Sequence, residues 1–200
     1  MIVAIFAGAS ATQEITDWSE LADEALFAIV TVMSAGEGGE NTPLSSGFII
    51  SGDGKVVISF KVIAGKRNLL VRRNDGSFLT VKGFITVDAD KGLIILQAER
   101  NNLPFISFGD SDKVKLRKAI CVISSMPSAA GQISTGVVSA FRELKGGLKT
   151  LQITTPVTKK SISAPVFDKN AEIIGIASFC PLEEGQVVSI AIPSNVAKSF

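Results

Sequence analysis

The sequence consists largely of short runs of Val, Ile and Phe that Gly, Asp and Asn interrupt, with almost no helical periodicity between them. Runs of this length and composition are typical of β-strands. Short strands at this spacing favour antiparallel barrels or a sandwich over alternating βαβ units. We expect a first series of strands at 28–33, 47–50, 55–60, 68–72, 78–87 and 93–97, and a second at 120–124, 134–141, 148–154, 164–167, 172–179 and 186–192.

The two series of strands predict two lobes. Residues 99–118 between them are polar and contain Pro and a Gly-Asp-Ser-Asp sequence, which is typical of a connecting segment. We therefore expect an N-terminal barrel lobe at 28–98, an interlobe linker at 99–118 and a C-terminal barrel lobe at 119–200. Two segments, 47–57 and 164–174, share the design of an apolar strand, an Asp-containing turn and a second apolar strand. This similarity suggests equivalent hairpins in the two lobes.

Residues 1–27 precede the strands and carry two different signals. Residues 1–11 are apolar and end in Ala-Ser-Ala, like the end of a secretory signal, although the basic n-region of such signals is missing. A truncated export signal and a buried terminal segment both fit. Asp17 or Ser19 is placed to cap a short helix that runs through Ala25. No window reaches the roughly 20 apolar residues of a membrane span, so we expect no transmembrane segment.

The composition excludes several classes of site. With 200 residues, 46% of them hydrophobic, the chain buries a core without a metal or disulfide. A net charge of +1 removes the long-range field that a general nucleic-acid binder uses. The absence of histidine rules out Ser-His-Asp, Cys-His and His-zinc chemistry. Cys121 and Cys180 allow one bridge, and no CxxC spacing indicates metal or redox use, so we expect no metal and no cofactor.

Several segments match one protein family in the order in which they occur. The first half contains residues 21–32 (LADEALFAIVTV), 46–54 (SGFIISGDG) and 103–112 (LPFISFGDSD). The second half contains residues 135–140 (TGVVSA), followed by Arg142, then 152–154 (QIT) and 189–194 (SIAIPS). Together they resemble the protease domain of the HtrA/Deg family of trypsin-like serine proteases. The resemblance implies an all-β fold, a trypsin-like double six-stranded antiparallel β-barrel with a short N-terminal helix.

The same resemblance locates the catalytic positions, and none of the catalytic residues is present. The family's base His corresponds to Lys61 in ISFKVI, its orienting Asp to Gly92 in DADKGLIIL, and its nucleophile Ser to Ile162 in KSISAP. Ile162 has no atom that can attack a carbonyl. Losing the nucleophile or the base of such a triad lowers turnover by a factor on the order of 10⁶. The resemblance therefore implies a pseudoprotease, not an enzyme.

Residues around Ile162 also differ from an oxyanion loop. Lys160 and Ala164 occupy positions where the family has glycine, and glycine reaches backbone conformations that other residues avoid. We expect Lys160, Ser161 and Ser163 to be a relaxed remnant of that loop. An alternative is a rewired peptidase in which Lys61 acts as base for Ser161 or Ser163. That lysine would first need burial to lower its pKa.

A second candidate site is the strand that contains Ser178, Phe179 and Cys180. This strand resembles the one that pairs with the substrate backbone in active relatives. An exposed strand edge binds an extended peptide through main-chain hydrogen bonds and needs no triad for this. A peptide-binding chaperone is therefore an alternative function, and an ordinary edge strand is the structural alternative.

Three further groups of charged residues have structural explanations. Asp88 and Asp90 form either a carboxylate pair or, as we expect, a turn before the strand at 93–97. The pair Lys159-Lys160 joins Lys61 in binding an acidic peptide or a phosphate, or is simply solvated. Basic pairs at 66–67 and 72–73 raise the question of nucleic acid. The chain has no Tyr, and its Phe residues lie in apolar runs, so stacking platforms are absent and we expect no nucleic-acid partner.

These observations predict a catalytically inactive HtrA-like protein that serves as a protein-binding or scaffolding subunit of a larger assembly. Its partner would be a protein or an extended peptide. The family resemblance implies self-association or a heteromeric assembly, so we expect a homo- or hetero-oligomer. The resemblance and the Ala-Ser-Ala sequence favour a periplasmic or otherwise exported protein; a cytoplasmic or organellar location is the alternative.

Overall fold

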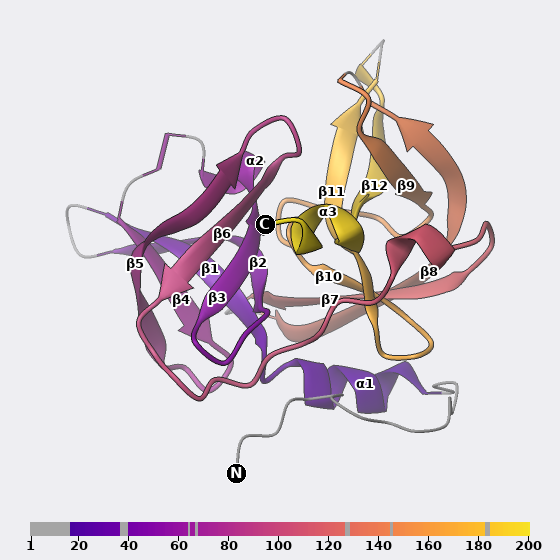
Figure 1. The fold of residues 1–200 in the computed structure, drawn as a ribbon. Coiled ribbons are helices and arrows are strands. Elements are labelled where there is room, and N and C mark those ends of the chain that lie inside the picture. The colour runs from indigo at the N-terminus through magenta and orange to yellow at the C-terminus, as the bar shows by residue number, and fades with distance from the viewer. Residues whose placement is uncertain are drawn as a thin grey trace.

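Twelve strands form two closed antiparallel barrels of six strands each in the computed structural model, which describes residues 17–36, 40–63, 65–66, 68–126, 129–144, 146–182 and 185–200 (Figure 1). Every strand overlaps one of the predicted runs, and the predicted all-β double barrel is confirmed. The first barrel contains β1 (Ile29–Ala35), β2 (Asn41–Ile49), β3 (Lys55–Ser59), β4 (Leu69–Arg73), β5 (Phe78–Asp88) and β6 (Leu93–Ala98). The second contains β7 (Ala119–Met126), β8 (Ala129–Glu143), β9 (Lys149–Ile153), β10 (Pro165–Asp168), β11 (Ile173–Pro181) and β12 (Val187–Pro193).

The two barrels have the same topology. Around the first the order is β1-β2-β3-β6-β5-β4, and around the second it is β7-β8-β9-β12-β11-β10. The hairpin β2–β3 is therefore equivalent to β8–β9, and β4–β5 is equivalent to β10–β11. The prediction that the hairpins at 47–57 and 164–174 are equivalent is wrong, because those residues form β2–β3 and β10–β11. Their sequences look alike because both place a tight turn between two buried strands.

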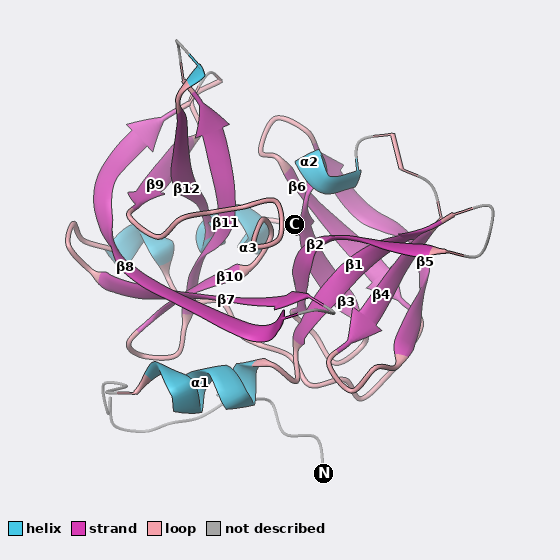
Figure 2. Cartoon of the chain, turned by 180° about the vertical axis from the view of Figure 1, so that it is seen from behind, coloured by secondary structure: helices cyan, strands magenta, loops and turns pink. Residues whose placement is uncertain are grey.

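Helix α1 (Trp18–Ala25) begins at Asp17, whose carboxylate accepts a hydrogen bond from the N–H of Ser19 at 2.8 Å. Asp17 is therefore the N-cap, and Ser19 is not. The apolar side of α1, which includes Leu21 and Ala25, is buried and lies against β7 and β8 (Figure 2). The remaining helices are short: α2 (Phe60–Ile63), the 3₁₀ turn η1 (Ser111–Lys113) and α3 (Ser194–Lys198). The apolar residues at 1–11 lie outside the described residues.

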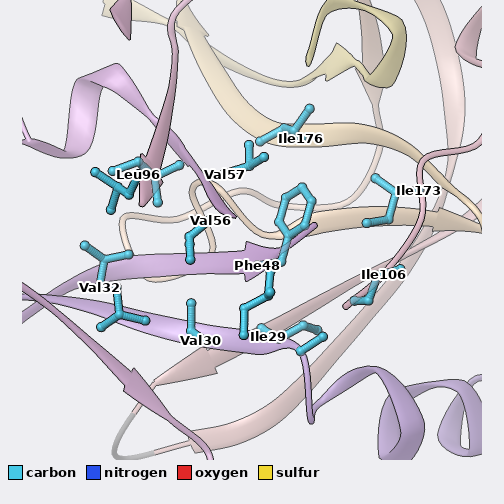
Figure 3. Close-up of a cluster of buried hydrophobic side chains, with 14 of the residues drawn as sticks. Ile29, Val30, Val32, Phe48, Val56, Val57, Leu96, Ile106, Ile173 and Ile176 are labelled. Carbon is cyan, nitrogen blue, oxygen red and sulfur yellow. The ribbon is translucent and has the colours of Figure 1, made fainter. Parts of the chain in front are cut away.

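One apolar core passes from the first barrel into the second. Phe48 of β2 is fully buried and shares this core with Ile173 and Ile176 of β11. Figure 3 shows its ring among Val57, Ile173 and Ile176. The ring also meets Phe108 of the interlobe segment edge to face, with 5.9 Å between the ring centres. The side chain of Phe48 therefore belongs to both barrels.

Buried hydroxyl groups join the barrels beside this core. The Thr31 hydroxyl donates to the carbonyl of Ser125 at 3.0 Å. The Ser46 hydroxyl accepts a hydrogen bond from the N–H of Ser125 at 3.1 Å and donates to the carbonyl of Lys160 at 3.1 Å. Asn74, in the turn before β5, donates to the carbonyl of Leu26 at 2.7 Å and contacts the Ser125 hydroxyl. Such directional bonds fix how the two barrels are oriented.

Replacing Phe48 by alanine should destabilise the whole chain, because the substitution removes a ring from the core that both barrels share. We expect Phe48→Ala to lower the free energy of unfolding by about 3–5 kcal/mol, measured by urea denaturation. Phe141→Ala is the matched control, since Phe141 on β8 is 54% exposed and its truncation should change stability by at most about 0.5 kcal/mol. Equal losses in the two variants would contradict a shared core.

Candidate functional site

The loop at the predicted nucleophile position closes on itself around Thr158. The N–H groups of Ser161 and Ile162 both donate to the Thr158 carbonyl, at 3.1 and 3.0 Å. The N–H of Lys160 donates to the Thr158 hydroxyl at 3.2 Å. The N–H of Thr158 itself donates to the Ser161 hydroxyl at 2.9 Å. Hydroxyl groups of Ser and Thr often satisfy neighbouring backbone groups in this way, and here they hold the loop in a compact turn.

The next two residues complete this bonding. The N–H of Ser163 donates to the carbonyl of Ala177 at 2.8 Å, and that of Ala164 donates to the carbonyl of Ser161 at 3.1 Å. From residue 160 to residue 164, each successive N–H group therefore has a partner within the protein. An oxyanion hole requires N–H groups that point at the ligand instead. The arrangement supplies no such pair from this loop.

The side chains of residues 161–164, the second half of this loop, are buried. Ile162 is 5% exposed and Ser163 is fully buried. The Ser163 hydroxyl accepts a hydrogen bond from the N–H of Ser59 at 2.7 Å, across the boundary between the barrels. Ser163 also has a φ of +67°, a left-handed conformation that favours glycine. The surrounding contacts therefore hold Ser163 in a backbone conformation that is strained for serine and would be unstrained for glycine.

Lys61 lies on α2 and its side chain reaches the second barrel. Its Nζ donates to the carbonyl of Phe179 at 2.6 Å and lies 4.8 Å from the centre of the Phe179 ring. The residue as a whole is exposed. The structure thus brings together the predicted base position and the predicted peptide-binding strand. It gives the Ser161 and Ser163 hydroxyls other partners, in Thr158 and Ser59.

The contact with Lys61 falls on the open edge of β11. Ala177 uses both its backbone groups toward the loop, donating to Ala164 at 2.9 Å and accepting from Ser163. Because residues alternate along a strand, Phe179 presents its N–H and carbonyl to the same side of β11 as Ala177 does. Pro181 has no N–H. Past Ala177 this edge therefore offers a peptide only the N–H of Phe179 and the carbonyls of Phe179 and Pro181. Lys61 already binds the carbonyl of Phe179.

The other two residues of the predicted peptide-binding strand face β12. Ser178 pairs with Ile190 and Cys180 pairs with Val188 in the β11–β12 ladder. Ser178 is buried, and Cys180 is half-buried.

Cys121 and Cys180 are both free, so the disulfide that the sequence allowed is absent. Burial raises the pKa of the Cys121 thiol to about 12.

Gly92, at the predicted position of the orienting Asp, lies in the turn between β5 and β6. Its φ is +72°, and its carbonyl accepts a hydrogen bond from the N–H of Phe60 at 2.9 Å. The Asp88 carboxylate caps the same turn by accepting from the N–H of Lys91 at 2.8 Å, which lowers the pKa of Asp88. Lys91 also pairs with this carboxylate at 3.4 Å. Asp90 is exposed, and the predicted turn is confirmed in place of a carboxylate pair.

The remaining charged candidates do not form a common site with these residues. Lys159 and Lys160 are exposed on the loop, whereas the ammonium of Lys61 is held by Phe179. In the first barrel Arg73 pairs with Asp75; Arg67 of the predicted basic pair lies outside the described residues. No group of three or more His, Cys, Asp or Glu residues suited to a metal occurs in the described part of the chain. Likewise, none of the helices that the structure describes is long and apolar enough to cross a membrane.

Two residues that shape this site were not identified from the sequence. Thr158 organises the loop through its carbonyl and its hydroxyl, and Ser59 binds Ser163 from the other barrel. The spacing of Thr158 and Ser161 was a usable signal, because Thr and Ser at this separation commonly cap local backbone groups. The sequence holds no comparable signal for Ser59, since its partner Ser163 is far away along the chain.

The comparisons with known proteins agree with this architecture. Residues 45–176 match the family model described as a trypsin-like peptidase domain. A probable periplasmic serine endoprotease, DegP-like, of Marinomonas sp. (strain MWYL1) is 34% identical over 166 residues, which cover 80% of this chain and 35% of that protein. Its counterpart in Brucella suis biovar 1 (strain 1330) is 32% identical over 160 residues, covering 76% of this chain and 31% of the relative. The chain thus spans about a third of the length of these relatives.

Solved structures show the same fold. The HtrA-type protease AlgW with a tripeptide superimposes with a TM-score of 0.78 at 21% identity, over 92% of this chain and 62% of that one. AlgW with a decapeptide gives a TM-score of 0.78 at 19% identity, over 92% and 66% of the respective chains. The family match over most of the chain, the DegP-like relatives and the double barrel lead to one conclusion: the chain belongs to the trypsin-like peptidase domain family and is an HtrA/DegP-like domain.

Proposed function

We propose that this HtrA/DegP-like domain is catalytically inactive and acts as a protein-binding or scaffolding subunit. The observation that carries the proposal is the loop at 158–164, where Ile162 replaces the nucleophile and the N–H groups are bonded within the protein. Attack on a carbonyl needs a nucleophilic atom and donors for the oxygen that becomes negatively charged. This loop provides neither.

The size of the two deficits supports the proposal. Loss of the nucleophile or base lowers turnover by about 10⁶, and loss of a single oxyanion donor lowers it by about 10²–10³. The positions of Lys61 and Gly92 add to these losses, because Lys61 binds Phe179 and Gly92 has no carboxylate to orient a base. Restoring one group therefore leaves the others missing.

A rewired peptidase built on Lys61 and Ser161 or Ser163 is the second candidate, and the contacts of these residues argue against it. A lysine base must be desolvated next to the serine that it deprotonates. Lys61 is exposed, and its Nζ donates to the backbone carbonyl of Phe179 and not to either serine. Ser163 is fully buried against Ser59.

For the partner, we propose a protein surface and not an extended peptide on β11. Solved HtrA-type neighbours hold a tripeptide or a decapeptide, which keeps a peptide-binding chaperone in view for this fold. Here Lys61 is bound to the β11 carbonyl that such a peptide would use, and Pro181 removes a donor. DegP-like relatives are named periplasmic, which supports the proposal that this protein is exported. We also propose that it forms a homo- or hetero-oligomer.

The absence of a nucleophile predicts that the protein neither reacts with a fluorophosphonate probe nor degrades casein. The restored-triad variant Lys61→His/Gly92→Asp/Ile162→Ser should remain at the level of the wild-type chain, because the amides of Lys160 and Ile162 still bond to Thr158. For the wild-type chain and the variant alike, gel fluorescence measures labelling by the probe, and a casein digest measures proteolysis. Labelling of the wild-type chain that is lost in Ser161→Ala or Ser163→Ala would overturn the proposal and establish the rewired peptidase.

Removing the lysine should open the edge of β11. We expect Lys61→Met to bind a fluorescent extended apolar peptide about tenfold more tightly than the wild-type chain, measured by anisotropy, because one hydrogen bond and one cation–π contact no longer compete. Lys160→Met is the control, since it removes an exposed lysine from the neighbouring loop. Equal affinities of the wild-type and Lys61→Met chains would show that Lys61 does not close the edge.

A further inference from the structure

Strand β5 runs well past its shorter neighbour and has an open edge. β4 pairs only with the start of β5, from Leu70↔Thr80 to Arg72↔Phe78. β6 pairs along the other side of β5 as far as Asp88. From residue 81 onward, β5 has no strand partner on its β4 side within the described part of the chain. In Figure 1 β5 begins on the outer side of the first barrel and ends at the turn to β6, where Lys91 lies over the ring of Phe200. Figure 2 shows the same barrel from behind.

The topology makes β5 the counterpart of β11. Each is the fifth strand of its barrel and extends beyond a short fourth strand, β4 or β10. In the second barrel the overhanging edge is engaged by Lys61. In the first barrel no equivalent side chain of the described residues is bonded to the β5 edge in this way. Among the described residues, the overhanging edge of β5 therefore lacks the side-chain contact that the edge of β11 has.

The overhang of β5 is apolar and exposed. Phe84, Ile85 and Val87 are 53%, 46% and 53% exposed, which makes this the densest group of exposed large apolar side chains on any described strand. A side chain added at Gly83 would contact nothing within 4 Å. The segment 83–87 contains neither a charge nor a proline, the residues that usually protect an open edge. An uncovered segment of this kind tends to pair with another strand.

Two charges on either side of this segment select the partner. Lys82 precedes it and Asp88 follows it, and Ile85 is midway between them. When a strand pairs with its own copy in antiparallel orientation around its central residue, the residue before the centre faces the residue after it. We propose that β5 pairs with β5 of a second copy of this chain across a two-fold axis at Ile85, which places each Lys82 opposite the Asp88 of the other copy.

The present ion pairs of these residues do not prevent the exchange. Lys82 pairs with Glu99 at 3.5 Å with both side chains 58% exposed, and an exposed pair of this type contributes little stability and is easily rearranged. The Asp88 side chain is 24% exposed and pairs with Lys91 at 3.4 Å. In the dimer Asp88 keeps its hydrogen bond from the N–H of Lys91, and Lys82 of the second copy replaces the Lys91 ammonium. In the dimer, Ile85 meets its own copy and Val87 covers the open space at Gly83. The apolar segment is then removed from water in both molecules.

The length of the overhang limits the strength of this dimer. The β5–β6 ladder shifts register between Val81 and Gly83 and between Phe84 and Thr86, so Lys82 and Ile85 face no residue of β6. Such irregularities twist an edge and keep pairing short. A contact confined to residues 82–88 is smaller than a standard stable interface. The dimer is therefore reversible and depends on protein concentration. This inference does not depend on the proposed lack of catalysis.

Disulfide trapping tests the two-fold axis. Facing Cα atoms in an antiparallel pair are about 4.5–5.5 Å apart, a separation that a disulfide spans. In a Cys180→Ser background, Ile85→Cys should cross-link into a covalent dimer under mild oxidation, as read by non-reducing gel electrophoresis. Phe141→Cys is the control, because Phe141 is similarly exposed, at 54%, on another strand. Cross-linking of Ile85→Cys that is no faster than that of Phe141→Cys overturns the proposal.

Charge reversal tests the register. Sedimentation velocity over a concentration series should give a dimer for the wild-type chain, and Lys82→Asp or Asp88→Lys should each weaken it about tenfold by placing like charges opposite each other. The double variant Lys82→Asp/Asp88→Lys should restore the wild-type dimer, although it still lacks the carboxylate that caps the turn at Lys91. A wild-type chain that stays monomeric, or a double variant that stays as weak as the single variants, overturns the proposal. A chain that grows into large aggregates does so too.

Discussion

The burial of Phe48 in a core common to both barrels is the constraint on which the rest of the structure depends. A closed barrel must fill its interior; the second barrel has an apolar cluster of its own, and the core of the first continues across the boundary to residues such as Ile173 and Ile176. Apolar packing alone does not fix the relative orientation of the two barrels. The hydrogen bonds of the Thr31 and Ser46 hydroxyls are directional and do fix it. Only because the barrels are fixed in this way do Lys61 and Phe179, which come from different barrels, meet in a defined geometry.

The loop at 158–164 satisfies its own backbone groups. Buried or half-buried N–H groups must find acceptors, and this loop supplies most of them from within itself. Thr158 does so with two oxygen atoms. The end of the loop is also joined to β11, because Ala177 accepts a hydrogen bond from the N–H of Ser163 and donates one to the carbonyl of Ala164. The match to the trypsin-like peptidase family covers residues 45–176, which include this loop.

The fold was largely predictable from the sequence, and the site only in part. Alternation and Val/Ile/Phe content are local properties, so each of the strands was expected near its observed place, and Asp17 was one of two candidate caps. Pairing between strands is not local. This is why 47–57 and 164–174 were mistaken for equivalent hairpins, and why the contact of Lys61 with Phe179, 118 positions apart, had no signature. The overhang of β5 was also hidden, because it depends on where the antiparallel strand β4 begins and not on the sequence of β5.

Asn74 gives the molecule a mechanical property. It sits in the turn from which β5 departs, and its amide is bonded to the end of α1 and touches Ser125 on β7. Phe78, the first residue of β5, is thus only a few residues from a point where the first barrel is joined to α1 and to β7. A tensile load applied along β5 would be shared among the helix and both barrels from the outset, so the strand would resist shear as part of the whole body instead of peeling away alone.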